Sequence, residues 1–297
     1  MEQKKYTDVT RLGHKTTLDV LKEGDQIVIQ EKIDGANASF KVVDGEIFAF
    51  SRNTQLSEDN TLGGFYEFAK SLDADKLLAG VIYFGEWTNA HKVRYPEYEK
   101  QFFLYDIYNT HIDKYVSFSM VKDEAHRLGL NLVPVFYEGE YQSFEHLQSF
   151  VGRTDIGGKL GDIDTGEGIV VKNVSYIDRF GNQKFVKLVT DAFREVQKQK
   201  APKDPKRELT QEQQFVDMTV TNARVEKMLY KFVDEGILDE HFGIEDMGKI
   251  LKNMSPRILE DILKEESDSL PPEHDPKELS KAVSRTVVKI VKPLINK

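Results

Sequence analysis

The chain has 297 residues, a formal net charge of −9, 39% hydrophobic residues and 31% charged residues, as expected for a globular protein of one large or two ordinary domains. It contains no cysteine, which excludes a disulfide framework, a thiolate zinc site and a cysteine nucleophile. The negative charge argues against a protein that coats nucleic acid indiscriminately, but an enzyme needs only a locally basic groove. Because no signal peptide or membrane-spanning run is present, we expect a cytoplasmic protein that does not bind membranes. We also expect it to be a monomer.

Short strand-like runs dominate the chain up to about residue 197. The first three strands are predicted over residues 26–30, 37–43 and 46–51, and Asp34-Gly35 and Asp44-Gly45 stand at the two connections. Asp-Gly pairs are typical of tight turns, so these strands are predicted to form an antiparallel meander. Further strands are predicted over 81–84, 102–108, 132–137, 168–172 and 184–189, and helices over 65–72, 119–128 and 143–151. This order indicates an α+β domain built around an antiparallel sheet.

The sequence changes character after a polar, basic stretch with two prolines at residues 197–207, which we interpret as a linker. Beyond it, the apolar residues follow helical spacing over 211–234, 244–253, 256–266 and 276–291. Ser255 followed by Pro256 is typical of a helix start. We therefore predict two domains, residues 1–197 with mixed structure and residues 208–297 with helices only.

The first candidate for chemistry is Lys32, in the segment Glu31-Lys32-Ile33-Asp34-Gly35-Ala36-Asn37. A lysine at a strand end, two residues before Asp-Gly, can present its amine to a bound substrate. The same pattern fits a surface lysine on a tight turn, and a Lys-x-Asp-Gly string arises often by chance. Five further motifs follow in order: Ser51-Arg52-Asn53, Phe84-Gly85-Glu86-Trp87, Phe102 to Ile107, Glu167 to Lys172, and Lys184-Phe185-Val186-Lys187.

This ordered series resembles the motifs of the covalent nucleotidyltransferases, the superfamily of polynucleotide ligases and mRNA capping enzymes, over about residues 30 to 190. The local detail resembles the phage-type RNA ligase 2 branch, because Glu31, Asn37 and Arg52 stand at that branch's places around the lysine. Glu167, Gly168 and Lys172 match its Glu-Gly-x-x-x-Lys motif. The resemblance implies an antiparallel nucleotidyltransferase domain followed by a small helical domain.

The resemblance also implies the roles of the matched residues. Lys32 would attack ATP and carry AMP as a lysyl-AMP, with Lys187 as the second catalytic lysine. The nucleotide would be contacted by Glu31, Lys32, Ile33, Asn37, Arg52, Glu86, Tyr105, Val170, Lys172 and Lys187. Attack needs a neutral amine, so cations must lower the pKa of Lys32. Glu167 is the best candidate ligand for Mg²⁺ or Mn²⁺, because these ions favour carboxylate oxygens.

Several positions allow more than one interpretation. The branch usually ends on Lys-x-Lys, whereas Lys187-Leu188-Val189 keeps only the first lysine, and Lys184 is a possible replacement. Tyr105 stands where phenylalanine is common, which preserves stacking. Beside it, Asp106 fits a buried polar group or a residue close to the metal. His91, Lys92 and Arg94 fit either a patch that receives phosphates or a solvated loop. Asp162 and Asp164 fit a flexible acidic loop better than a weak metal contact.

The resemblance implies an RNA ligase that joins 3′-OH and 5′-phosphate ends, in the cytoplasm or as a phage protein in its host. The ends could belong to a nicked duplex, be held on a template or be free single strands, and the sequence leaves these three open. A DNA ligase or a capping-type guanylyltransferase is the alternative within the superfamily. Those enzymes usually carry a five-stranded OB-fold after the first domain, where residues 208–297 show helices. A third alternative is an inactive nucleic-acid-binding module on the same fold, against which Lys32, Glu86, Glu167 and Lys187 argue together.

Overall fold

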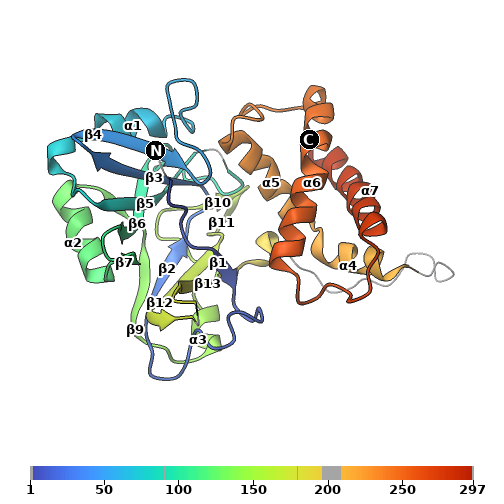
Figure 1. The fold of residues 1–297 in the computed structure, drawn as a ribbon, viewed down its shortest axis with the longest axis horizontal. Coiled ribbons are helices and arrows are strands. Elements are labelled where there is room, and N and C mark those ends of the chain that lie inside the picture. The colour runs from blue at the N-terminus through green and yellow to red at the C-terminus, as the bar shows by residue number, and fades with distance from the viewer. Residues whose placement is uncertain (1–2, 90, 179, 196–208, 296–297) are drawn as a thin grey trace. The chain divides into compact units, whose positions relative to one another are not determined.

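A computed structural model describes residues 3–89, 91–178, 180–195 and 209–295 of the chain. The chain divides into two compact units, Met1–Thr190 and Asp191–Lys297 (Figure 1). All the strands belong to the first unit and the second is helical, so the predicted α+β class is confirmed. The predicted linker over residues 197–207 lies outside the described residues. Within the described ranges, no helix is long and apolar enough to cross a membrane.

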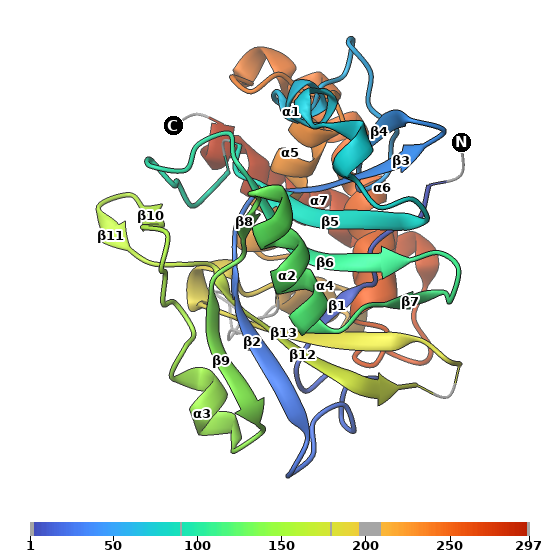
Figure 2. The ribbon, with the colours of Figure 1, turned by 90° about the vertical axis from the view of Figure 1, so that its left-hand side faces the viewer.

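The strands of the first unit form two large sheets, seen one above the other in Figure 2, and a separate two-stranded hairpin. The first sheet has the order β1 (Val9–Arg11), β13 (Gln183–Val189), β12 (Gly168–Ile177), β2 (Gln26–Lys32) and β9 (Val135–Glu140). The second sheet has the order β4 (Glu46–Ser51), β3 (Ala36–Val43), β5 (Val81–Trp87), β6 (Phe102–Asn109) and β7 (Lys114–Tyr115), with β8 (Asn131–Leu132) also paired to β6. The ladders are antiparallel, except that β1 runs parallel to β13 and β8 parallel to β6.

The predicted meander is wrong at its first connection. β2 pairs with β12 and β9, whereas β3 pairs with β4 and β5. The Asp34-Gly35 segment is therefore the crossing from the first sheet to the second. A Cβ atom at Gly35 would lie 2.5 Å from the carbonyl oxygen of Trp87, so glycine is needed here for the close approach of β5. At the second connection, Asp44 and Gly45 have φ of 52° and 77° and turn β3 into β4 as predicted.

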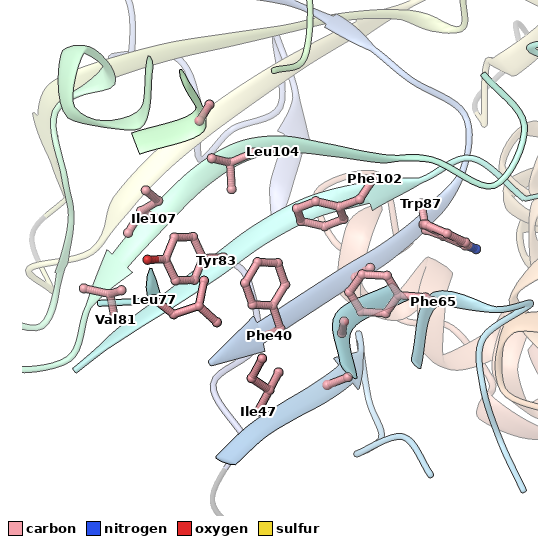
Figure 3. Close-up of a cluster of buried hydrophobic side chains, with 14 of the residues drawn as sticks. Phe40, Ile47, Phe65, Leu77, Val81, Tyr83, Trp87, Phe102, Leu104 and Ile107 are labelled. Carbon is pink, nitrogen blue, oxygen red and sulfur yellow. The ribbon is translucent and has the colours of Figure 1, made fainter. Parts of the chain in front are cut away.

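The second sheet carries a large hydrophobic core on its outer face, against α1 (Phe65–Ser71) and α2 (Phe118–Leu128). Figure 3 shows the aromatic part of this core, where the rings of Phe40 and Tyr83 stack with centroids 4.8 Å apart. Burying one side chain of this size contributes about 1.5–3 kcal/mol. Because strand residues alternate between faces, the opposite face of the same sheet is left to meet the first sheet.

The first sheet also buries both of its faces. Its outer face packs against Leu147 of α3 (Phe144–Gln148), through a cluster made of Val20, Ile27, Ile29, Ile169, Val171 and Val186. Its inner face contributes Phe185 to a cluster with Tyr6, Ile82 and Phe84. Ile82 and Phe84 belong to β5 of the second sheet. The two inner faces thus pack on each other, and any polar residue on them lies between the sheets.

The second unit contains α4 (Gln211–Thr219), α5 (Asn222–Asp234), α6 (Met247–Glu265) and α7 (Pro276–Ile295). The single helix predicted over 211–234 is broken before Thr221, whose side chain caps α5 by accepting a hydrogen bond from the Arg224 N–H. The two helices predicted over 244–253 and 256–266 are wrong in the opposite sense, because α6 is continuous through Pro256. Proline removes one backbone donor, while the buried residues Ile250, Met254, Ile258 and Ile262 keep one apolar stripe along α6.

A buried arginine ties three segments of the second unit together. Arg224 of α5 is 1% exposed and pairs with Asp261 of α6 and, at 2.8 Å, with Glu266. Glu195 lies 3.4 Å from the same guanidinium. An ion this deeply buried is tolerated only when it is paired, so the carboxylates fix how α5 and α6 pack.

Candidate active site

Lys32 is the last residue of β2, and its amine donates a hydrogen bond to Glu167 Oε2 at 2.6 Å. The two side chains are 22% and 10% exposed. Glu167 immediately precedes β12, whose first residue, Gly168, pairs with Lys32. A Cβ atom at Gly168 would lie 2.1 Å from the carbonyl oxygen of Leu188, so only glycine lets β12 run this close to β13. The glycine of the Glu-Gly motif thereby brings the proposed nucleophile and the proposed metal ligand together.

Three predicted nucleotide-binding residues lie on the inner face of the second sheet. Asn37 of β3 pairs in register with Glu86 of β5, and its side-chain amide donates to the hydroxyl of Tyr105 on β6. Glu86 Oε1 accepts a hydrogen bond from the Gly35 N–H at 3.2 Å. The crossing between the sheets therefore places Lys32 beside this group.

The Glu86 carboxyl has an unusual protonation state. Burial raises its pKa from 4.5 to about 8, an effect that Lys32 and His91 oppose and that Glu167 and Asp34 reinforce. At neutral pH the carboxyl is therefore mostly protonated in the nucleotide-free protein. Strongly shifted carboxyls gather at functional sites because such sites collect buried and charged groups.

The inner face of the first sheet carries Val170, Lys172 and Lys187 as well as Lys32. Val170 pairs with both Gln30 and Lys187, and strand alternation gives Lys32 the same face as Gln30. The Lys172 amine is 2.7 Å from both Asp106 Oδ2 and the carbonyl oxygen of Tyr105.

Lys172 is 2% exposed. Burial lowers its pKa and Asp106 opposes that shift. Asp106 also accepts a hydrogen bond from the Tyr6 hydroxyl. Lys172 and Asp106 thus form a buried pair that holds the backbone of Tyr105, which fits the structural interpretation of Asp106 and leaves the Lys172 amine engaged within the protein.

Three other predicted residues lie away from this group or are held by other side chains. Ile33 is 4% exposed and belongs to the buried apolar set. Glu31 lies on the opposite face of β2 from Lys32 and accepts hydrogen bonds from Thr154 Oγ1 at 2.8 Å and the Asp155 N–H at 2.9 Å. Arg52 follows β4 and donates to Asp8 Oδ1 at 2.6 Å.

Lys184 does not replace the missing second lysine of the last motif. It stands three residues before Lys187 on β13, so the two side chains leave opposite faces. Its amine lies 3.5 Å from Asp178. Arg11 of β1, which the sequence interpretation missed, pairs in parallel register with Lys187 and so places a cation on the inner face. A three-residue strand gives no periodic signal by which it could have been found.

In the predicted basic patch after Glu86, His91 is buried, Lys92 is half-buried and Arg94 is exposed. His91 is 7% exposed, and its Nδ1 lies 3.6 Å from Asp34 Oδ1. Asp34 Oδ2 accepts from the Val93 N–H, and the Asp34 N–H donates to the hydroxyl of Tyr95. Burial alone would raise the pKa of Asp34, but His91 and these neighbours lower it overall. His91 is thus part of the buried framework around Asp34, and the phosphate-binding interpretation stays a prediction for Lys92 and Arg94.

The acidic loop before Glu167 forms a small hairpin of β10 (Lys159–Leu160) and β11 (Ile163–Asp164). Asp162 and Asp164 are exposed on it, and Asp164 pairs with Lys159 at 2.6 Å. Within the described residues, Glu167 is therefore the predicted metal ligand that the fold places next to Lys32.

Comparison with known proteins places this site within a matched region. The model of the RNA ligase family matches residues 25–189, which include Lys32, Glu86, Glu167 and Lys187. No curated protein matches the chain. Among solved structures, Naegleria gruberi RNA ligase with PPi is 17% identical with a TM-score of 0.47, over 64% of this chain and 57% of that one. A mutant of the same ligase with ATP and Mn is 16% identical with a TM-score of 0.47, over 63% and 56%. The chain spans a little over half the length of these proteins.

Proposed function

Because the chain belongs to the RNA ligase family, we propose that it joins the 3′-OH and 5′-phosphate ends of RNA through a lysyl-AMP intermediate. ATP is the proposed AMP donor and Mg²⁺ or Mn²⁺ the proposed metal. The observation that carries the proposal is the Lys32 amine, 2.6 Å from Glu167 and next to Glu86. A nucleophilic lysine, a carboxylate suited to a metal and a group suited to a ribose thus lie together.

The nucleotide would lie between the two inner faces of the sheets. Tyr105 would stack on the adenine, since Asn37 holds its hydroxyl and Lys172 its carbonyl oxygen. Glu86 would bind the ribose hydroxyls. Lys187 and Arg52 would bind phosphates, for which Arg52 has to exchange its ion pair with Asp8.

Glu167 fits a divalent cation, because Mg²⁺ favours hard oxygen ligands and often binds through one or two carboxylates. When bound, the cation supplies positive charge against the phosphates of ATP. In the ligand-free protein Glu167 holds the Lys32 amine, and an ammonium paired with a carboxylate is not a nucleophile. Lys32 therefore has to be released from Glu167 before it attacks. Its ammonium then loses one proton to solvent and becomes the neutral amine. The nitrogen bonds to the α-phosphorus as the bond to pyrophosphate breaks, and it gives up a second proton to solvent to form the phosphoramidate.

The test is incubation of the protein with α-labelled ATP and Mg²⁺ or Mn²⁺, followed by denaturing electrophoresis. Lys32→Ala should abolish labelling, and Glu167→Ala should reduce it in a way that depends on the metal concentration. Lys22→Ala, at an exposed lysine of the same unit, is the matched control and should label normally. Labelling of Lys32→Ala at the wild-type level would contradict the proposal. Labelling by GTP alone would point instead to a capping-type enzyme.

The second unit is proposed to serve the polynucleotide, because every proposed nucleotide contact lies at or before Lys187. Holding two RNA ends in register is an orientation problem that is separate from ATP binding. A fragment of residues 1–195 should therefore still form lysyl-AMP and lose most of its ability to seal a nicked duplex. Equal loss of both activities would show that the first unit does not fold without the second. Full retention of sealing would show that the helical unit serves another purpose.

A further inference from the structure

The last helix, α7, carries a row of positive charges on the side turned away from its core. Its apolar residues Leu279, Ala282, Val283, Val287 and Val291 are buried. The α7 cation row is exposed and consists of Lys277, Lys281, Arg285, Lys289 and Lys292. Successive members are three or four residues apart, which gathers them on one side of a helix with 3.6 residues per turn.

The segment that precedes α7 in the second unit has the opposite net charge. Residues 209–275 contain sixteen acidic and seven basic residues, whereas α7 contains the five cations of the row and one acid, Glu278. In a chain with a net charge of −9, this segregation makes α7 a basic surface that follows an acidic segment of the same unit. Such an asymmetry attracts a polyanion.

The fold of the unit makes little use of these charges. Lys281 pairs with Glu278 at 2.8 Å. The cationic groups of Lys277, Arg285, Lys289 and Lys292 are in no ion pair within the described residues of the chain. Like charges four residues apart on a helix are mutually destabilising by about 0.2–0.5 kcal/mol per pair. The row therefore costs stability in the isolated protein, and its benefit has to come from an external anion.

We propose that the α7 cation row binds the phosphate backbone of the RNA substrate, an inference that rests on the proposed ligase function. From Lys277 to Lys292 the helix rises about 22 Å, at 1.5 Å per residue. At about 3.4 Å per phosphate along one strand of a duplex, this length spans six or seven phosphates. The apolar face of α7 is taken up by the core of the unit, so the helix has no face with which to enter a membrane.

The experiment measures binding of the full chain to a nicked RNA duplex of mixed sequence at several salt concentrations. The test variant carries Arg285→Ala, Lys289→Ala and Lys292→Ala. The matched control carries Lys249→Ala, Lys252→Ala and Lys264→Ala, which remove three exposed cations of α6 in the same unit. A third variant, with Arg285→Lys, Lys289→Arg and Lys292→Arg, retains every charge of the row.

Loss of three phosphate contacts should weaken binding roughly 500-fold at 0.1 M salt and make the log–log salt dependence shallower by about 2.7. The control and the charge-retaining variant should bind like the wild type. RNA binding by the test variant at wild-type strength would overturn the inference, as would a loss with an unchanged salt slope. Labelling of the protein by ATP distinguishes failure of this inference from failure of the proposed function. The test variant should label normally. A wild-type protein that does not label at all would contradict the ligase assignment itself.

Discussion

Replacing Glu86 with glutamine should make the first unit more stable at high pH. Glutamine keeps an oxygen for the Gly35 N–H, which Glu86 Oε1 accepts at 3.2 Å, and it cannot ionise. The pKa of Glu86 is raised by burial from 4.5 to about 8, so between these values the folded protein holds a proton that the unfolded chain has lost. Stability therefore falls as pH rises through this window, by about 1.4 kcal/mol per pH unit and up to about 5 kcal/mol in all.

Glu86→Gln removes this loss, so its advantage over the wild type should be small near pH 4.5, grow through neutrality and level off above pH 8. The chain has a single tryptophan, Trp87, which is 3% exposed beside Glu86. Its fluorescence in urea titrations reports unfolding of the first unit alone. Glu97→Gln, at an exposed glutamate, is the control. A stability difference between Glu86→Gln and wild type that changes by less than about 1 kcal/mol from pH 5 to pH 9 would refute the reasoning.

Three further substitutions test buried or competing charges. Asp106→Asn leaves the Lys172 ammonium without its anion and should destabilise the first unit by about 3–5 kcal/mol, again measured by tryptophan fluorescence. A loss of unfolding free energy below about 1 kcal/mol would mean that Lys172 is neutral in the folded protein. Arg224→Met should destabilise the second unit by a similar amount, which should appear as faster hydrogen exchange of the α5 amides. Unchanged exchange would show that Arg224 and its carboxylate partners do not stabilise the fold. Asp8→Asn frees Arg52 from its 2.6 Å ion pair and should lower the KM for ATP severalfold at low salt, whereas a raised KM would show that Asp8 positions Arg52 for the nucleotide.

The motif order was sufficient to select three residues that the fold brings together. Lys32, Glu86 and Glu167 lie 54 and 81 residues apart in sequence, yet the fold gathers them as the resemblance implied. Each stands beside a glycine or at a strand end. The backbone conformation at such positions restricts the residue type locally, so these positions can be recognised in the sequence. Most strand ranges were predictable for the same reason, because alternation is a local property.

What the sequence did not predict depends on contacts between distant segments. The Asp34-Gly35 pair gives the same signal whether the chain turns back in a hairpin or crosses to another sheet, since both need glycine. The pairing of Asp34 with His91 joins residues 57 positions apart and has no local signature. Strand alternation could have predicted the face on which Lys184 lies, because two strand residues three apart point to opposite faces. The sequence interpretation did not apply this rule.

The parallel pairing of β1 with β13 has a consequence for synthesis on the ribosome. Residues 9–11 of β1 pair with residues 185–187, near the end of the first unit. The nascent chain can fold β3 to β6 as they emerge, but the inner face of the first sheet stays open until β13 has left the exit tunnel. At about 5–20 residues per second, some 150 residues after Lys32 take roughly 8–30 seconds to translate. The nucleophile is therefore made long before its site exists, and the protein has no competent site for ATP until the unit is complete.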